Sequence, residues 1–380
     1  MNFLKTTIRY LTKDKAFSFI NILGLAVGLT AVLCIAFYVV RETNYDRFHR
    51  DADRIYRVSI TMSGGGMENE TFIFTPPTGP AMKSEVPEVE EYTRITWRRS
   101  FIAVCNEKSF KLDDVNYADT AFFNMFTFPI IRGNSQTALA APYSIVLTEE
   151  YANKFFGDQD PMGQTVRLDN MNEFTVTGIV KAPPVNSHFN FNALISFSTL
   201  YQLPNTRMDW NGGNNYITYL RLHKNANLEA VKAKMQTILW ENLGKVIAQA
   251  GWKISGNLHP LRDLHLYHDH ESIYLRIFVI VFAALALITL SIACINFVNL
   301  TTARSMRRVR EASVRKALGA KRFNLVRQFL GESLLIAMAA FVIALIRPCV
   351  RSYRDNRRHR RQLPSHSPVV PRPCHDSQRR

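Results

Sequence analysis

The residues best suited to bind a metal ion lie just before the second long apolar segment of this 380-residue chain. Imidazole and carboxylate groups can together hold a divalent cation, and both kinds occur here, at Asp263, His265, His268, Asp269, His270 and Glu271. The spacing H-x-x-H-x-H matches no common zinc pattern. A polar segment beside a membrane explains the same composition, so we predict no metal site.

Signals for enzymatic catalysis are also weak. Ser187 and His188 are adjacent, but the residues of a catalytic triad meet in space rather than in sequence. The chain has no G-x-x-x-x-G-K-[ST] loop for nucleotide phosphates, and Gly64–Gly66 lacks the strand-before, helix-after context of a dinucleotide site. We expect these glycines to form a turn. The sequence therefore predicts no catalytic residue, no cofactor and no ATP hydrolysis by this chain alone.

The charge spacing in residues 304–330 suits a different task. Glu311 lies four residues after Arg307 and four before Arg315, so it can pair with both on one helix face. Gly319 is placed to end that helix. A short charged helix joined to membrane spans can transmit force. A solvated loop would carry the same positive charge only as a topology signal, and the spacing alone leaves both interpretations open.

Two apolar segments must position these residues. Residues 16–40 and 277–303 contain no charged side chain. As helices rising about 1.5 Å per residue, each exceeds the roughly 30 Å hydrocarbon core of a bilayer, which excludes a purely soluble globular protein. A third apolar run, 333–346, spans about 21 Å as a helix and is too short to cross. Gly24 and Gly28 have the G-x-x-x-G spacing that lets two helices approach closely, although chance can produce the same spacing in an apolar run.

The charge of the chain is distributed unevenly. The net charge is +16, yet residues 41–275 carry 23 basic and 26 acidic side chains. Basic residues instead flank the apolar segments, in residues 1–15 and 304–330, which is the positive-inside pattern. We therefore predict that these flanks are cytoplasmic and that residues 41–275 lie outside. Residues 1–15 are expected to form an amphipathic helix at the membrane surface, so the basic charge indicates a lipid bilayer rather than nucleic acid.

Residues 41–275 are expected to form an α+β domain. Alternating apolar residues predict a strand at residues 56–60, and polar turns predict hairpins around residues 106–108 and 169–172. Two helices are expected, one capped by Thr148 and ending at Gly157, the other capped by Asn227 and ending at Gly244. Strands and helices do not alternate regularly, which favours α+β over a doubly wound sheet.

Composition changes abruptly at Arg347. The last 34 residues, 347–380, contain ten Arg but no Lys, Gly or Ala. An Arg-rich tail can bind nucleic acid or lipid. The change falls inside an apolar run, however, which favours translation in the wrong frame or a disordered extension. We therefore expect a shortened copy of a longer membrane protein.

Several motifs resemble those of one transporter family. The strongest are the stretches 311–321 (EASVRKALGAK) and 328–335 (QFLGESLL), which resemble the signature of FtsX-like permeases, the membrane subunits of MacB-type ABC transporters. Residues 17–26 resemble their first span, and 44–49 (NYDRFH) and 52–58 (ADRIYRV) resemble the entry to their periplasmic domain. The stretches 175–180, 183–184 and 186–189 (NSHF) resemble a later part of that domain.

This resemblance implies a membrane protein of α-helical transmembrane segments, with a large α+β extracytoplasmic domain inserted between spans one and two. It implies a multi-pass permease in the bacterial cytoplasmic membrane that works with a separate ABC ATPase, as a homo- or heterodimer. The ATPase-coupling residues would be Arg307, Glu311, Arg315, Lys316, Leu318, Gly319 and Ala320. The alternatives are a membrane-anchored extracytoplasmic binding or sensor protein, and a non-functional gene fragment.

Overall fold

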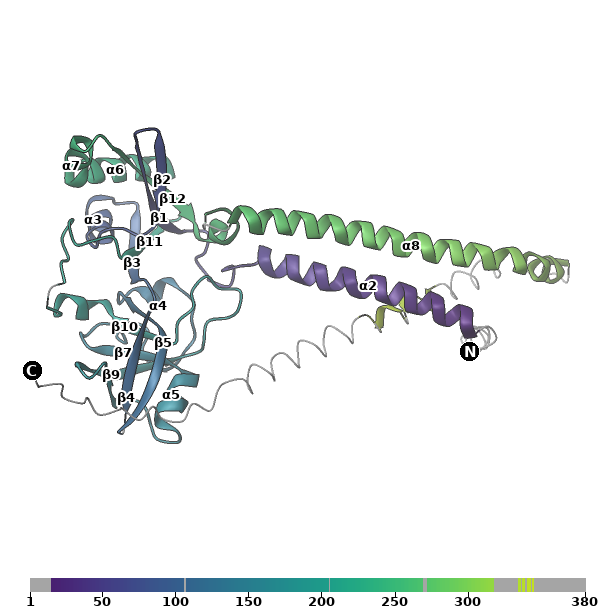
Figure 1. Cartoon of the computed structure of the whole chain (residues 1–380), viewed down its shortest axis with the longest axis horizontal. Coiled ribbons are helices and arrows are strands. Elements are labelled where there is room, and N and C mark those ends of the chain that lie inside the picture. The colour runs from purple at the N-terminus through teal and green to yellow at the C-terminus, as the bar shows by residue number, and fades with distance from the viewer. Residues whose placement is uncertain are drawn as a thin grey trace, which may run out of the picture. The chain divides into compact units, whose positions relative to one another are not determined.

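The computed structural model describes residues 15–105, 107–204, 206–268 and 272–317, together with 334–335, 337–338, 340–342 and 344. The described residues form two compact units, a helical one and the α+β domain Asn44–Ser272 (Figure 1). Residues 1–14, the coupling residues Leu318, Gly319 and Ala320, and the tail 347–380 lie outside the described residues.

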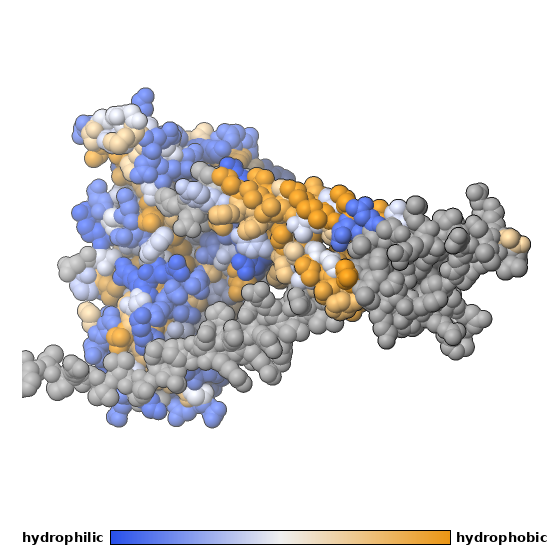
Figure 2. Space-filling model, turned by 45° about the vertical axis from the view of Figure 1, so that its right-hand side comes forward, coloured by the Kyte–Doolittle hydropathy of each residue, from blue (hydrophilic) through white to orange (hydrophobic). Residues whose placement is uncertain are grey.

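The helical unit contains α2 (Lys15–Thr43) and α8 (Ser272–Ala317). Each has a stretch long and apolar enough to cross a membrane, at Ile22–Thr43 and Tyr274–Asn299. Apolar side chains gather over these helices, whereas the surface of the α+β domain is mostly hydrophilic (Figure 2). Helix α8 does not end near residue 303, where the expected span stops, but continues as one helix of 46 residues through the basic segment to Ala317.

Six strands of the α+β domain close into a barrel. They follow the order β5–β4–β8–β9–β7–β10, and β10 pairs in parallel with β5 to complete the circle. Alternation along β8, where Val166 and Leu168 are buried and Thr165 and Arg167 are exposed, shows the expected strand period. Helix α5 (Glu149–Phe156) adds Phe155 and Phe156 to the barrel core. The strands are β4 (Arg99–Cys105), β5 (Lys108–Ala118), β7 (Ser144–Thr148), β8 (Thr165–Leu168), β9 (Asn172–Val180) and β10 (Ala193–Ser196), with β6 (Ile130–Gly133) added to β9.

A second, antiparallel sheet has the order β3–β11–β1–β12. Its strands are β3 (Val89–Thr96), β11 (Tyr216–Leu222), β1 (Ile55–Gly64) and β12 (Lys253–Pro260), and β2 (Met67–Thr71) forms a hairpin with β1. Helices α3 (Thr78–Glu85) and α6 (Leu228–Leu239) pack on this sheet over a separate apolar core. Barrel and sheet join where β3 meets β5, at one paired position, Ile95 with Ala118.

The remaining elements are short. Helix α4 (Phe122–Met125) contributes to an aromatic cluster, defined here as Phe122, Phe126, Phe128, Phe189 and Phe191. Irregular helical turns occupy Phe197–Tyr201, Leu261–Asp263 and Leu264–His268, and α6 continues through a wide turn, Trp240–Gly244, into α7 (Lys245–Gln249).

Local predictions for this domain mostly agree with the structure. Both expected hairpins form, as β4–β5 and β8–β9, and the side chain of Asn227 accepts hydrogen bonds from the backbone N–H of Glu229 and Ala230. Gly65 and Gly66 form the β1–β2 turn with φ of +59° and +80°, which glycine adopts without strain.

Two local predictions were wrong. Gly244 does not end its helix, which continues to Gln249. A Cβ at this position would lie 2.4 Å from the ring of Trp240, so the glycine makes room for an indole rather than stopping a helix. Thr148 precedes α5, but its hydroxyl makes no cap hydrogen bond.

Candidate functional site

The predicted coupling residues lie on the basic end of α8. Arg307, Glu311, Arg315 and Lys316 all fall within this continuous helix. Positions four apart lie on the same side of an α-helix, so the backbone places Arg307, Glu311 and Arg315 along one face. The position of a helix stop at Gly319 lies outside the described residues.

A second set of residues lies where the chain leaves α2. Asn44 directly follows that helix, and its carbonyl accepts a hydrogen bond from Nδ2 of Asn186 at 3.2 Å. The backbone N–H of Asp46 donates to the carbonyl of Asn186 at 2.9 Å. Two of the family-like motifs, 44–49 and 186–189, therefore meet although 142 residues separate them in sequence.

The link between these motifs is a buried carboxylate paired with a histidine. Asp46 is fully buried, its Oδ1 accepts the backbone N–H of His188 at 3.0 Å, and its Oδ2 lies 2.8 Å from the imidazole Nδ1. Burial by itself would raise the pKa of Asp46. The charge and hydrogen bonds of His188 lower it by more than burial raises it, so the pKa of Asp46 lies below its ordinary value. The backbone of Asp46 has φ of +55°, a conformation that aspartate tolerates better than most residues.

A second histidine in the same place is neutral at ordinary pH. His49 is buried, its Nδ1 accepts the backbone N–H of Thr127 at 3.0 Å, and its Nε2 lies 3.9 Å from Asp46. Burial lowers the pKa of His49 to about 4, although the nearby charge of Asp46 acts in the opposite direction. We call the set Asp46, His49, Asn186 and His188 the clasp.

The aromatic cluster supports the clasp. Phe126 packs at 4.5 Å from the ring of Phe189 and 5.4 Å from that of Tyr219, whose hydroxyl lies 2.9 Å from His188 Nε2. Phe122 stacks on Phe128 at 5.7 Å. Packed aromatic rings therefore support the His188 side of the clasp, and such rings resist displacement more than flexible aliphatic side chains would.

The chain that leads to α8 is attached to the same cluster. Leu261 and Leu264 are fully buried with its phenylalanines, and the ring of His265 stacks on Tyr45 with centroids 3.6 Å apart. His265, one of the residues weighed and set aside as a metal ligand in the sequence, is thus used in stacking. Among the described residues, no group of three or more potential ligands could hold a metal ion.

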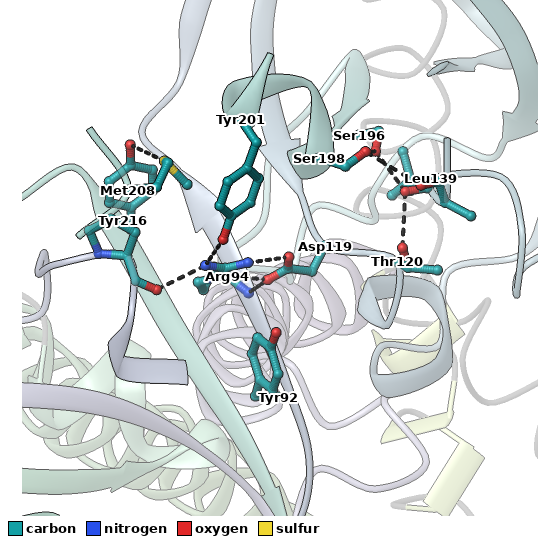
Figure 3. A network of polar contacts seen from close by, with 12 residues as sticks. Tyr92, Arg94, Asp119, Thr120, Leu139, Ser196, Ser198, Tyr201, Met208 and Tyr216 are labelled. Atoms are coloured by element: carbon teal, nitrogen blue, oxygen red, sulfur yellow. Dashed lines mark hydrogen bonds and ion pairs between the residues drawn. The ribbon is translucent and has the colours of Figure 1, made fainter. Parts of the chain in front are cut away.

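A buried arginine joins the barrel to the sheet (Figure 3). Arg94 on β3 donates from Nε and Nη2 to the two carboxylate oxygens of Asp119 at 2.9 and 2.8 Å, and from Nη1 to the carbonyl of Pro76 and the hydroxyl of Tyr201. Its guanidinium carbon lies 3.9 Å from the ring centre of Phe197. Burial would lower the pKa of Arg94, but Asp119 more than offsets this and raises it. We call Arg94, Asp119 and Tyr201 the clamp.

Two surface cavities flank these contacts. One of about 370 Å³ lies beside the clamp and is lined by Tyr92, Asp119 and Gln136 among others. The other, of about 480 Å³, borders the aromatic cluster and is lined mainly by residues 123–128 and 133–135. Neither lining includes a serine or cysteine hydrogen-bonded to a base, the pairing that activates a nucleophile.

Sequence reasoning did not find the clasp or the clamp. The motif residues of the clasp were visible as family-like stretches, but nothing local showed that Asp46 and His188 would meet. Arg94 carried no signal, because a single arginine in a strand is ordinary.

The fold and its two apolar helices are those of a membrane protein with a large α+β domain. The model of the MacB-like periplasmic core domain matches residues 18–238, and that of the FtsX-like permease C-terminal region matches residues 283–347. The chain therefore belongs to the MacB/FtsX-like ABC transporter permeases, which confirms the resemblance seen in the motifs. The second match ends at the residue where the composition changes.

The chain spans less than half the length of the curated relatives that it matches. It is 24% identical over 280 residues to the pyoverdine export ATP-binding/permease protein PvdT of Pseudomonas syringae pv. syringae, a match that covers 70% of this chain and 39% of the relative. It is 24% identical over 201 residues to the macrolide export ATP-binding/permease protein MacB of Neisseria meningitidis serogroup A, covering 53% and 29%.

Solved structures also match over part of the chain. A domain of a permease protein from Porphyromonas gingivalis matches with a TM-score of 0.49 and 23% identity, over 56% of this chain and 91% of that one. The periplasmic region of MacB from Actinobacillus actinomycetemcomitans matches with a TM-score of 0.35 and 18% identity, over 52% and 87%.

Proposed function

We propose that this chain is the permease subunit of a MacB-type ABC transporter, which couples ATP hydrolysis by a separate ATPase to movement of the α+β domain. The observation that carries the proposal is the continuity of α8. A single helix runs from the apolar stretch Tyr274–Asn299 through the basic segment to Ala317, so a push on its basic end has no flexible joint to absorb it before the apolar stretch.

The charge pattern supports an orientation for this subunit. Basic flanks at residues 1–15 and 304–330 lie on the cytoplasmic side, and residues 41–275 lie outside, inserted between the first two spans of a multi-pass protein in the cytoplasmic membrane. The partners are an ABC ATPase, a second permease subunit and the bilayer, with no role for nucleic acid. The proposed activity is export or mechanical signalling. The relatives' names include pyoverdine and macrolide export, so these two compounds are the first substrates to test.

The coupling role is assigned to Arg307, Glu311, Arg315, Lys316, Leu318, Gly319 and Ala320, as a docking surface for the ATPase. Proline at Ala312 would remove one backbone donor and destabilise the helix by about 3 kcal/mol. Ala312→Pro should therefore abolish co-purification of the proposed partner ATPase. Ala312→Ser is the matched control, since serine is tolerated in a helix, and it should retain the ATPase.

The same pull-down separates charge from helix geometry. Glu311→Lys turns two attractive i,i+4 pairs into repulsive ones, each of about 0.2–0.5 kcal/mol, so it should weaken binding only if Glu311 also contacts the ATPase. All four tryptophans, Trp97, Trp210, Trp240 and Trp252, lie in the α+β domain, so their fluorescence checks that this domain is intact in each variant. Full retention of the ATPase by Ala312→Pro would reject docking and leave the basic segment as a topology signal.

A further inference from the structure

We propose that the clasp is a force-bearing joint, which ties the end of α2 to the barrel as well as to the sheet. This inference rests on the proposed function, because a joint matters only if α2 moves. It adds a specific load path through Asp46 and His188, two residues that the sequence does not place together.

The joint lies at the first tertiary attachment after α2. Helix α2 ends at Thr43, and Asn44 and Asp46 are both already hydrogen-bonded to Asn186. Between these two residues, Tyr45 stacks on His265, and the next hydrogen bonds along the chain join His49 of the clasp and then Arg50 to Thr127. Any displacement that α2 delivers therefore meets the clasp before it reaches another part of the domain.

The clasp divides that displacement between the two halves of the domain. The covalent chain runs on from His49 to β1, which belongs to the sheet. The segment held by Asp46 runs instead from Asn186 to β10, a barrel strand. Without the clasp, α2 would act first on the sheet through the covalent chain, and its displacement would reach the barrel through the Arg50–Thr127 bond, the β3–β5 contacts, the clamp and the apolar core that sheet and barrel share.

The far side of the clasp is anchored on the barrel. Asn192, just before β10, donates its backbone N–H to the carbonyl of Asp114 at 2.9 Å and its Nδ2 to the carbonyl of Asp113 at 2.9 Å. Its own carbonyl accepts the backbone N–H of Thr148 at 2.9 Å. Segment 186–192 is thus fixed to residues of both strands that neighbour β10.

His188 also contacts the sheet, since its Nε2 lies 2.9 Å from the hydroxyl of Tyr219 on β11. The imidazole therefore lies between the carboxylate that follows α2 and a strand of the sheet. The same carboxylate accepts the backbone N–H of His188 at 3.0 Å, and hydrogen bonds to a charged group are roughly twice as strong as neutral ones. This chemistry suits a contact that must transmit displacement without opening.

Single-molecule pulling tests the joint in the full chain without the ATPase. Handles are attached through cysteines at Val40, on α2, and Met171, an exposed barrel residue, with the native cysteines replaced by serine. In the parent chain, residues 44–48 should yield only when the domain unfolds. In His188→Ala they should straighten first, in a separate step of at most about 18 Å, the reach of five extended residues.

Two further variants keep the test decisive. Asn186→Ala removes the side-chain bond to Asn44 but leaves the Asp46–His188 pair, so the early step should be rarer in this variant than in His188→Ala. If tryptophan fluorescence shows that His188→Ala is unfolded, Asn186→Ala takes its place in the test. His223→Ala changes an exposed histidine of the same domain and should behave as the parent does. Identical traces for the parent, His188→Ala and Asn186→Ala would overturn the joint.

The result is independent of the docking proposal. The clasp lies outside residues 305–320, so His188→Ala should still retain the ATPase in the pull-down. No early step in His188→Ala, with the ATPase bound by the parent chain, would reject the joint and keep the proposed function. An early step in His188→Ala, with no ATPase bound by the parent chain, would support the joint and reject the proposed function.

Discussion

The α+β domain and the pair of helices α2 and α8 are held together by different kinds of contact. In the domain, charged and polar groups are buried with specific partners, such as Arg94 with Asp119 and Asp46 with His188. In the helical unit, the apolar core consists of small or aliphatic residues: Leu25 and Ala26 on α2, Ala293 on α8, and Ala340 from the third apolar run. The domain should therefore respond strongly to loss of one charge, and the helix pair to added volume.

The largest effect is expected from the clamp. Arg94→Met keeps most of the side-chain volume but leaves the Asp119 carboxylate without its bidentate partner, which should destabilise the domain by about 3–5 kcal/mol. Urea unfolding followed by tryptophan fluorescence measures this, because every tryptophan lies in the domain.

The chain supplies a matched control for the clamp. Arg132 and Asp160 make the same two-bond contact, at 2.7 and 2.8 Å, but both side chains are about half exposed. Water screens an exposed pair and leaves it little net stabilisation, so Arg132→Met should change the unfolding midpoint little. Equal effects of the two substitutions would show that burial does not set the strength of these pairs.

Acid should weaken the clasp, because the buried, neutral His49 must gain a proton that the unfolded chain binds more readily. The pKa of His49 is about 4 in the folded domain and near 6.5 when unfolded. The unfolded chain therefore binds more protons between these values, and stability falls as pH drops from 6.5 to 4, by about 3 kcal/mol at most. The lowered pKa of Asp46 adds a further loss only below its ordinary value of 3.8.

Unfolding midpoints measured at half-unit steps of pH check this expectation. His49→Asn, which has a side chain that can still accept the Thr127 N–H, should flatten the dependence between pH 6.5 and 4. His223→Asn, at an exposed position, should leave it unchanged. A slope that survives His49→Asn would assign the acid sensitivity to another group.

Local features of this fold were predictable from sequence, and contacts between distant segments were not. The Asn227 cap and the two hairpins depend on residues within a few positions of one another, and all three form. Closure of the barrel depends on β10 meeting β5, which are far apart in the chain, and no local pattern specifies that pairing. Gly244 was misread because its reason, the ring of Trp240, concerns packing rather than helix ending.

The candidate sites divide in the same way. The coupling face of α8 follows from a four-residue period, so the sequence alone could place Arg307, Glu311 and Arg315 on one face. Asp46 and His188 are 142 residues apart, and each forms its part of the clasp only when the other is in contact with it. Sequence showed that both motifs were family-like but not that they form one contact.

The smallest effect is expected in the helix pair, where the G-x-x-x-G spacing supplies its own control. A Cβ at Gly28 would lie 2.7 Å from Cβ of Ala293 on α8, which is closer than packed carbons allow, whereas a Cβ at Gly24 would lie 3.4 Å from Nδ2 of Asn296, an ordinary contact. Gly28→Ala should therefore push α2 and α8 apart at a cost of about 1–2 kcal/mol, and Gly24→Ala should be close to neutral. Spin labels at the exposed positions Val40 and Phe278 report the separation of the helices as a distance distribution in detergent. Gly28→Ala should broaden it and lengthen its mean, and adding Ala293→Gly should restore the parent distribution, because the second change removes the clashing methyl group. A distribution that Gly28→Ala leaves unchanged, or that Gly24→Ala alters as much, would show that the glycine spacing does not set this contact and is left by chance in an apolar run.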